Sequence, residues 1–129
     1  MRRLVHFEIH ATDPARVLPF YTALFGWTAQ KLPGPVDYWL LTTGAPGDLG
    51  VDGALMRRRG APPAEGQPVN AFVCTVDVES VDDVEARLAA LGGTVAVPKM
   101  AIPGVGWLLY IKDPDGNILG ALQADSLAK

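Results

Sequence analysis

The chain has 129 residues, of which 49% are hydrophobic and 19% are charged, a composition typical of a globular domain and not of a disordered segment. Its 14 acidic residues outnumber its 11 basic ones, and this balance argues against a nucleic-acid partner, because phosphate contacts need a basic surface. A single cysteine leaves no intrachain disulfide, and neither a membrane-spanning run nor a signal-peptide core is visible, so we expect a cytoplasmic protein without a membrane partner.

The first half of the chain predicts one strand, one helix and three further strands. Residues 5–10 alternate between apolar and polar, which is typical of a half-buried strand. Asp13 and Pro14 form a helix start, and Gly26 is suited to end that helix in the left-handed conformation. Pro19 should bend the helix. Further strand candidates lie between turn-forming residues, at 27–29, 38–42 and 53–56.

The second half predicts the same order of elements. Residues 69–74 form a strand candidate, and Ser80 followed by Asp83 resembles a capping box at a helix start. Gly92 and Gly93 should end this helix. Three strand candidates follow, at 94–97, 107–111 and 117–122.

Short sequence echoes connect the two halves. The run Trp-Leu-Leu occurs at 39–41 and 107–109, and Gly-Ala-Leu occurs at 53–55 and 120–122. The spacing from His6 to Asp13 also equals that from Asn70 to Asp77. Internal duplication explains these echoes best.

We therefore predict an α+β fold of two tandem βαβββ units that form a cupped mixed sheet. The predicted domain covers residues 1–129, with units at 1–59 and 69–125 and a Gly/Pro-rich linker at 60–68. A ferredoxin-like βαββαβ order fits less well, because three strand candidates and then a linker and a fresh strand separate the two helices.

Three stretches resemble the vicinal oxygen chelate superfamily, which includes glyoxalases, bleomycin-resistance proteins and extradiol dioxygenases. They are His6-Phe7-Glu8-Ile9 with Asp13, the run Phe-Tyr-Thr-Ala-Leu-Phe-Gly-Trp at 20–27, and Asp-Pro-Asp-Gly-Asn at 113–117. The order and spacing match along nearly the whole chain. These motifs describe a helix face with its cap and a tight turn, so they identify a fold and say little about chemistry.

The resemblance implies a cavity in which metal-dependent relatives hold a divalent ion. Its four ligand positions map to His6, Gly53, Asn70 and Gly120, and relatives that bind metal have Glu where this chain has Gly120. Glycine offers no donor side chain, and a catalytic metal needs about three protein ligands, so we expect no metal and no cofactor. Glu8 paired with His6 or His10 could chelate an ion only weakly.

The same cavity is the predicted ligand site. If Val5, Phe7 and Ile9 face the helix, the polar side chains between them face the cavity. We expect the two glycines to leave room at its floor, and the aromatic residues of the central strands to stack on a planar ligand. The predicted ligand-binding residues are His6, Glu8, His10, Asn70, Phe72, Cys74, Gly53, Gly120, Trp39 and Tyr110. The plainer alternative is that the polar groups satisfy one another and that the aromatic residues and Cys74 are ordinary packing residues.

Three functions remain open at this point. The first is a metal-free protein that binds a small aromatic or amphipathic molecule. The second is a lyase, isomerase or hydroxylase in which Glu8, with His6 or His10, transfers protons. The third is a dimeric interaction module with a vestigial cavity. We expect a homodimer in each case, since the resembling family often pairs its units.

Overall fold

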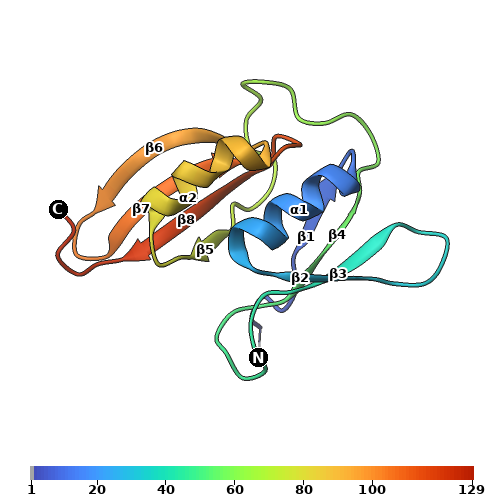
Figure 1. Ribbon diagram of the computed structural model, residues 1–129, viewed down its shortest axis with the longest axis horizontal. Helices are drawn as coiled ribbons and strands as arrows, with labels where there is room; N and C mark the ends of the chain where they lie inside the picture. Colours follow the sequence, from blue (N-terminus) through green and yellow to red (C-terminus); the bar gives the residue numbers. More distant parts are fainter. Residues whose placement is uncertain (1) are drawn as a thin grey trace. The chain divides into compact units, whose positions relative to one another are not determined.

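The computed structural model describes residues 2–129, which divide after Pro62 into two compact units (Figure 1). Each unit has a strand, a helix and three more strands, and its strands form a four-stranded mixed sheet. The predicted α+β fold of two tandem βαβββ units is confirmed. No helix within residues 2–129 is long and apolar enough to cross a bilayer.

Unit 1 comprises the residues up to Pro62. Its strands are ordered β1-β4-β3-β2, with β1 parallel to β4 and the other neighbours antiparallel. The elements are β1 (Glu8–Ala11), α1 (Pro14–Phe25), β2 (Thr28–Lys31), β3 (Tyr38–Thr42) and β4 (Gly53–Arg57).

Helix α1 begins and ends at the predicted residues. Pro14 occupies the first turn, and Gly26 ends the helix with φ of 71°, which a residue with a Cβ rarely adopts. Pro19 lies inside the helix. Asp13 stands at the N-cap with extended backbone, as predicted for the helix start, but its side chain makes no capping hydrogen bond. The helix buries an apolar stripe consisting of Val17, Phe20, Tyr21 and Leu24.

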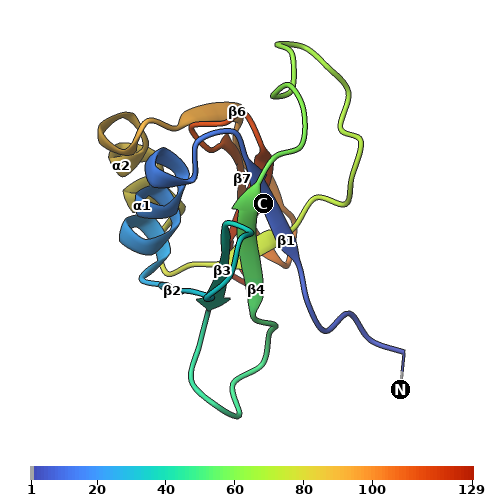
Figure 2. The same ribbon diagram turned by 90° about the vertical axis from the view of Figure 1, so that its right-hand side faces the viewer.

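Each sheet has a proximal face, which is turned toward the helix of its own unit, and a distal face on the other side (Figure 2). In unit 1 the Phe7 ring lies 5.8 Å from the Trp27 ring, which stacks on Tyr21 of α1. Phe7 is therefore proximal, and Glu8 and His10 are distal because strand side chains alternate.

Unit 2 comprises Pro63–Lys129, and its strands are ordered β5-β8-β7-β6. Ser80 caps helix α2 as predicted, because its Oγ accepts a hydrogen bond of 3.1 Å from the Asp83 N–H. A short 3₁₀ helix over Ala89–Leu91 follows and ends at Gly92, where φ is 80°. The remaining elements are β5 (Thr75–Asp77), α2 (Val81–Leu88), β6 (Thr94–Ile102), β7 (Gly106–Lys112) and β8 (Ile118–Ala124).

A hydrogen bond to α2 identifies the faces of the second sheet. The Gln123 side chain accepts a 3.1 Å hydrogen bond from the Val81 N–H at the start of α2, so Gln123 is proximal. Ala121, two residues away, is proximal and fully buried. Gly120 and Leu122 are therefore distal.

The predicted first strand of each unit is displaced in the structure. Residues 5–10 were expected in the first unit, but β1 is Glu8–Ala11; residues 69–74 were expected in the second, but β5 is Thr75–Asp77. Each first strand begins only where it meets its parallel partner strand. At these points the Ala54 N–H donates to the Phe7 carbonyl, and the Gly120 N–H donates to the Cys74 carbonyl, both at 2.9 Å. The earlier alternating residues lack such a partner strand.

These two hydrogen bonds also match the units residue by residue. Phe7 corresponds to Cys74, and Glu8 to Thr75, so the helix starts at Asp13 and Ser80 correspond as well. The expected match of Asn70 with His6 is wrong, because it aligned Asp13 with Asp77, which lies inside β5.

Candidate functional site

Four polar side chains gather on the distal face of unit 1, and we call them the polar row: His6, Glu8, His10 and Tyr38. The sheet register brings them together, because Met56 of β4 stands opposite His10 of β1 on one side and Tyr38 of β3 on the other. Residues directly opposite each other in a sheet share a face. His6 lies on the segment that leads into β1.

The polar row is a continuous hydrogen-bonded chain. The Tyr38 hydroxyl donates to Glu8 Oε2 at 3.1 Å, and His10 Nε2 lies 3.4 Å from Glu8 Oε1. A carboxylate oxygen accepts hydrogen bonds, so this contact requires His10 Nε2 to be the donor. Tyr38 has a single proton and gives it to Glu8, so the 3.0 Å contact with His6 Nε2 requires His6 to donate to the Tyr38 oxygen. Glu8 is thus the common acceptor at the centre of the row.

The electrostatics of the row keep Tyr38 protonated. The pKa of Tyr38 is raised above its usual 10.0, first by burial and then by the hydrogen bond to Glu8 and the charge of that carboxylate. A neutral phenol next to a carboxylate remains a donor at physiological pH. The row therefore presents fixed hydrogen-bonding groups at one place on the sheet.

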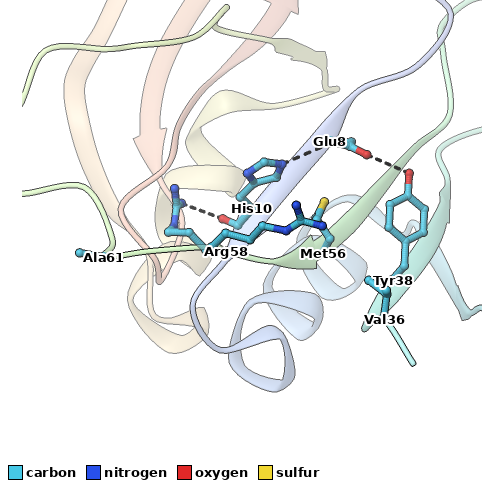
Figure 3. A pocket seen from close by; sticks show the side chains of 8 residues that line it. Glu8, His10, Val36, Tyr38, Met56, Arg58 and Ala61 are labelled. Carbon is cyan, nitrogen blue, oxygen red and sulfur yellow. Dashed lines mark hydrogen bonds and ion pairs between the residues drawn. The ribbon is translucent and has the colours of Figure 1, made fainter. Parts of the chain in front are cut away.

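A hollow of about 650 Å³ opens beside the polar row (Figure 3). Its size falls in the range of small-molecule sites. Arg58 borders it, and the Arg58 Nη2 donates to the His10 carbonyl at 2.8 Å. The lining combines polar and apolar side chains, namely Glu8, His10, Val36, Tyr38, Met56, Arg58, Arg59 and Ala61.

Sequence reasoning identified Glu8 and His10 but missed Tyr38 and the β4 residues of the hollow. A signal for them existed in the period-two pattern. Leu41 and Trp39 alternate with Tyr38 and Leu40, so a buried Leu41 implies that Tyr38 faces away from the helix. The register that brings Met56 beside His10 depends on the parallel pairing of β1 with β4, which no local pattern indicates.

The other predicted site residues lie in several places. Trp39 and Gly53 are on the proximal face of the first sheet, because both share the face of buried Leu41. Tyr110 and Gly120 stand opposite each other on the distal face of the second sheet. The remaining three precede β5 in exposed positions, and they are Asn70, Phe72 and Cys74.

The expected open floor at the two glycines is wrong. A Cβ at Gly53 would lie 2.6 Å from the Phe7 ring, so the aromatic ring already fills this space. At Gly120 a Cβ would lie 2.8 Å from Thr75 Oγ1 and 3.4 Å from a methyl carbon of Leu108. Both positions are close approaches within the sheets and not empty volume.

The donor set that residues 2–129 offer does not fit a catalytic metal site. Residues 2–129 contain no group of three or more His, Cys, Asp or Glu side chains that could hold an ion. The two backbone hydrogen bonds that match the units also make Ala54, and not Gly53, the counterpart of Gly120. Neither Ala54 nor Gly120 has a donor atom in its side chain. The three protein ligands that a catalytic divalent metal generally requires are absent from this part of the chain.

The family of the chain follows from its fold and from sequence comparison. Residues 3–120 match the family model described as "Glyoxalase/Bleomycin resistance protein/Dioxygenase superfamily". The chain belongs to this superfamily, and the resemblance inferred from its motifs is confirmed.

Two curated relatives illustrate the range of this superfamily. The chain is 30% identical over 120 residues to the protein named "Putative glyoxylase CFP32" from Mycobacterium tuberculosis, covering 92% of this chain and 44% of that protein. It is 29% identical over 119 residues to "Anthracycline biosynthesis protein DauV" from Streptomyces sp. (strain C5), covering 85% of this chain and 42% of that protein. The chain thus spans less than half the length of these relatives.

Solved structures share the fold. A glyoxylase/bleomycin resistance protein/dioxygenase domain from Frankia sp. EAN1pec superimposes with a TM-score of 0.69 at 23% identity, over 97% of this chain and 99% of that one. TnmS3, described as an antibiotic binding protein from Streptomyces sp. CB03234, gives a TM-score of 0.65 at 23% identity, over 97% and 98% of the two chains.

Proposed function

We propose that the chain binds a small aromatic or amphipathic molecule in the hollow of unit 1. The observation that carries this proposal is the lining itself. Hydrogen-bonding groups of Glu8, His10 and Tyr38 stand beside the apolar side chains of Val36 and Met56. A few fixed polar groups on an otherwise apolar surface orient small ligands in many binding sites.

The relatives support the same class of ligand. One similar structure is described as an antibiotic binding protein, and one curated relative is named for anthracycline biosynthesis. Anthracyclines are planar aromatic molecules with polar edges, which suits a surface of this mixed character. The predicted contributions of Asn70, Phe72, Cys74, Gly120 and Tyr110, which all belong to unit 2, stay predictions.

The hydrogen bonds that Glu8 already accepts favour a binding role over proton-transfer catalysis. Both of its carboxylate oxygens already have donors, His10 on Oε1 and Tyr38 on Oε2. A substrate that used Glu8 as a base would have to displace one of these donors. Glu8 instead orients the donors around it, and the proposed role of the row is recognition.

The proposed binding is independent of metal. The support is the donor set, since the counterpart positions Ala54 and Gly120 have no ligating side chain. Elemental analysis of purified protein should find no stoichiometric zinc, iron, manganese, nickel or cobalt. About one ion per chain, lost together with ligand binding on chelation, would contradict the proposal.

The homodimer expected from the family also stays a prediction. Light scattering at micromolar concentration should give twice the mass of the 13.7 kDa chain. A monomer mass would exclude it, without bearing on the ligand site of unit 1.

Calorimetric titration of the full chain with a planar tricyclic probe, anthraquinone-2-carboxamide, tests the binding proposal. We expect saturable binding that Met56→Gln weakens about tenfold, because a polar amide replaces an apolar wall. The matched control is Leu18→Gln on α1, which makes the same kind of change on the other side of the first sheet and should leave binding unchanged. Absence of binding, or equal weakening by both variants, would reject the hollow as the site.

A further inference from the structure

The hollow of unit 1 carries positive charge in a chain that is negative overall. Residues 1–62 contain seven basic and five acidic side chains, whereas residues 63–129 contain four basic and nine acidic ones. Among residues 2–129, two arginines, Arg58 and Arg59, line the hollow, and Glu8 is the single carboxylate in its lining. Fixed charge of one sign around a concave site attracts ligands of the opposite sign.

The carboxylates near the end of β4 already have partners. Asp37 contacts Lys31 at 3.3 Å and Arg57 at 3.1 Å, and these two cations hold the pKa of Asp37 below its usual value. Glu8 accepts from Tyr38 and His10. These carboxylates are therefore engaged by groups other than the two arginines of the hollow.

The two arginines differ in how they are held. The Arg58 side chain is anchored on the His10 carbonyl through Nη2 at 2.8 Å, and its backbone N–H donates to the Ala11 carbonyl at 2.8 Å (Figure 3). Arg59 makes no hydrogen bond or ion pair with any other residue in the range 2–129. A guanidinium has five N–H donors in a planar fork that matches a carboxylate. One anchored and one uncommitted guanidinium thus border the same hollow, which also presents the apolar side chains of Val36 and Met56.

From this arrangement we infer that the ligand is a planar aromatic molecule with an anionic edge, a carboxylate or an acidic phenolate. The anion meets Arg58 and Arg59, while the ring lies against Met56 and Val36. The Tyr38 and His10 groups contact further polar substituents. This inference rests on the proposed binding function and adds the charge of the ligand to it.

A matched pair of probes separates the two claims. Anthraquinone-2-carboxylate and anthraquinone-2-carboxamide share ring and shape and differ in charge. We expect the carboxylate to bind the full chain about tenfold more tightly, and this preference should shrink as salt is raised, because the contact is partly exposed. Arg59→Gln should weaken carboxylate binding about fivefold and leave carboxamide binding nearly unchanged.

Arg16→Gln is the matched control, since Arg16 is exposed on α1, away from the distal face. It removes the same charge from the same unit and should change neither affinity by more than about twofold. Melting followed by circular dichroism verifies that each variant is folded. Equal affinity for the two probes, or equal losses in Arg59→Gln and Arg16→Gln, would overturn the anionic ligand and leave the binding proposal standing. If neither probe binds, the proposed function and the inference are both wrong.

Discussion

The sheets of the two units carry similar residues on their proximal faces and different residues on their distal faces. On the proximal faces, Leu41 and Leu109 are both buried, with 1% and 0% of their surface exposed. Beside them Lys31 lies 5.5 Å from the Trp39 ring centroid, and Lys99 lies 4.9 Å from that of Trp107. The Trp-Leu-Leu echo in the sequence therefore marks a shared packing arrangement.

The distal faces carry different chemistry. The distal face of unit 1 carries Glu8 and Tyr38, which belong to the polar row. The distal face of unit 2 carries Leu108, Tyr110 and Leu122 instead. Packing against a helix restricts what a proximal residue can be, because core volume changes are costly. The distal face has no such restriction in its own unit, so duplicated units can diverge there and acquire ligand chemistry.

The largest expected effect tests the shared proximal packing. Leu41→Ala and Leu109→Ala each remove a fully buried side chain, and each should lower the free energy of unfolding by about 2–5 kcal/mol. Urea unfolding followed by circular dichroism measures both. Leu40→Ala is the control, because Leu40 is distal and 39% exposed, and it should cost about 1 kcal/mol or less. Equal losses for Leu40 and Leu41 would contradict the assignment of faces in unit 1.

A pair of glycine variants sharpens the comparison between faces. Gly53→Ala places a methyl group 2.6 Å from the Phe7 ring, which itself packs on Trp27, so we expect a loss of about 2–3 kcal/mol. Gly120→Ala places a methyl group against the small Thr75 side chain, and its loss of stability should be about 1 kcal/mol smaller than that of Gly53→Ala. Chemical denaturation of both variants gives the difference.

A smaller side chain at position 7, which relieves the contact between the Phe7 ring and the new methyl group at Gly53, provides the control for the glycine pair. Phe7→Leu combined with Gly53→Ala should be more stable than the sum of the single losses predicts, because the smaller side chain yields space. Strict additivity of the two losses would show that the Phe7 ring is not what Gly53 accommodates.

Local sequence signals predicted most of the fold, and the failures have a common cause. Helix α1 with Pro14 and Gly26, and helix α2 with Ser80, follow from capping chemistry that acts within a few residues. The first strand of each unit was misplaced because its limits depend on where a distant partner strand begins. Alternation at residues 5–10 and 69–74 continues beyond the paired region and cannot reveal that limit.

The candidate site shows the same division. Alternation correctly grouped His6, Glu8 and His10 on one face, and the structure joins them through Tyr38. Gly53 was grouped with Gly120 because both begin a Gly-Ala-Leu echo, but they lie on opposite faces of their sheets. A shift of one residue in strand register inverts every side chain, and sequence similarity alone does not fix register.

A smaller effect distinguishes the two helix starts. Ser80→Ala should cost about 1 kcal/mol, because it removes the acceptor of the Asp83 N–H. Asp13→Ala should cost only a few tenths of a kcal/mol, since Asp13 makes no capping hydrogen bond and contributes mainly through its charge near the helix dipole. Thermal or urea unfolding of the two variants compares them, and equal costs would show that the capping difference between the units has no energetic consequence.

The smallest effect concerns the pH dependence of the polar row. Because the pKa of Tyr38 is raised in the folded chain, the unfolded chain releases this proton first as pH rises through 10.0. The contribution of Tyr38 to stability is thus fully present below pH 10.0 and is lost as pH rises through the folded pKa. Tyr38→Phe should remove this part of the alkaline decline, which urea unfolding at a series of pH values would reveal.

Glu8→Gln separates the causes of that shift. The variant removes the carboxylate charge, so the pKa of Tyr38 should fall toward 10.0, but burial is the larger cause and should keep it above that value. Tyrosinate absorbance, compared with the Tyr38→Phe variant to isolate this residue, measures the change. Asp52→Asn, which alters a carboxylate bound to Thr43 and not to the row, should leave the titration of Tyr38 as it is. An unchanged Tyr38 titration in Glu8→Gln would mean that the row is assembled by packing alone, and the distal faces of the two units would then differ less in their chemistry than their side chains suggest.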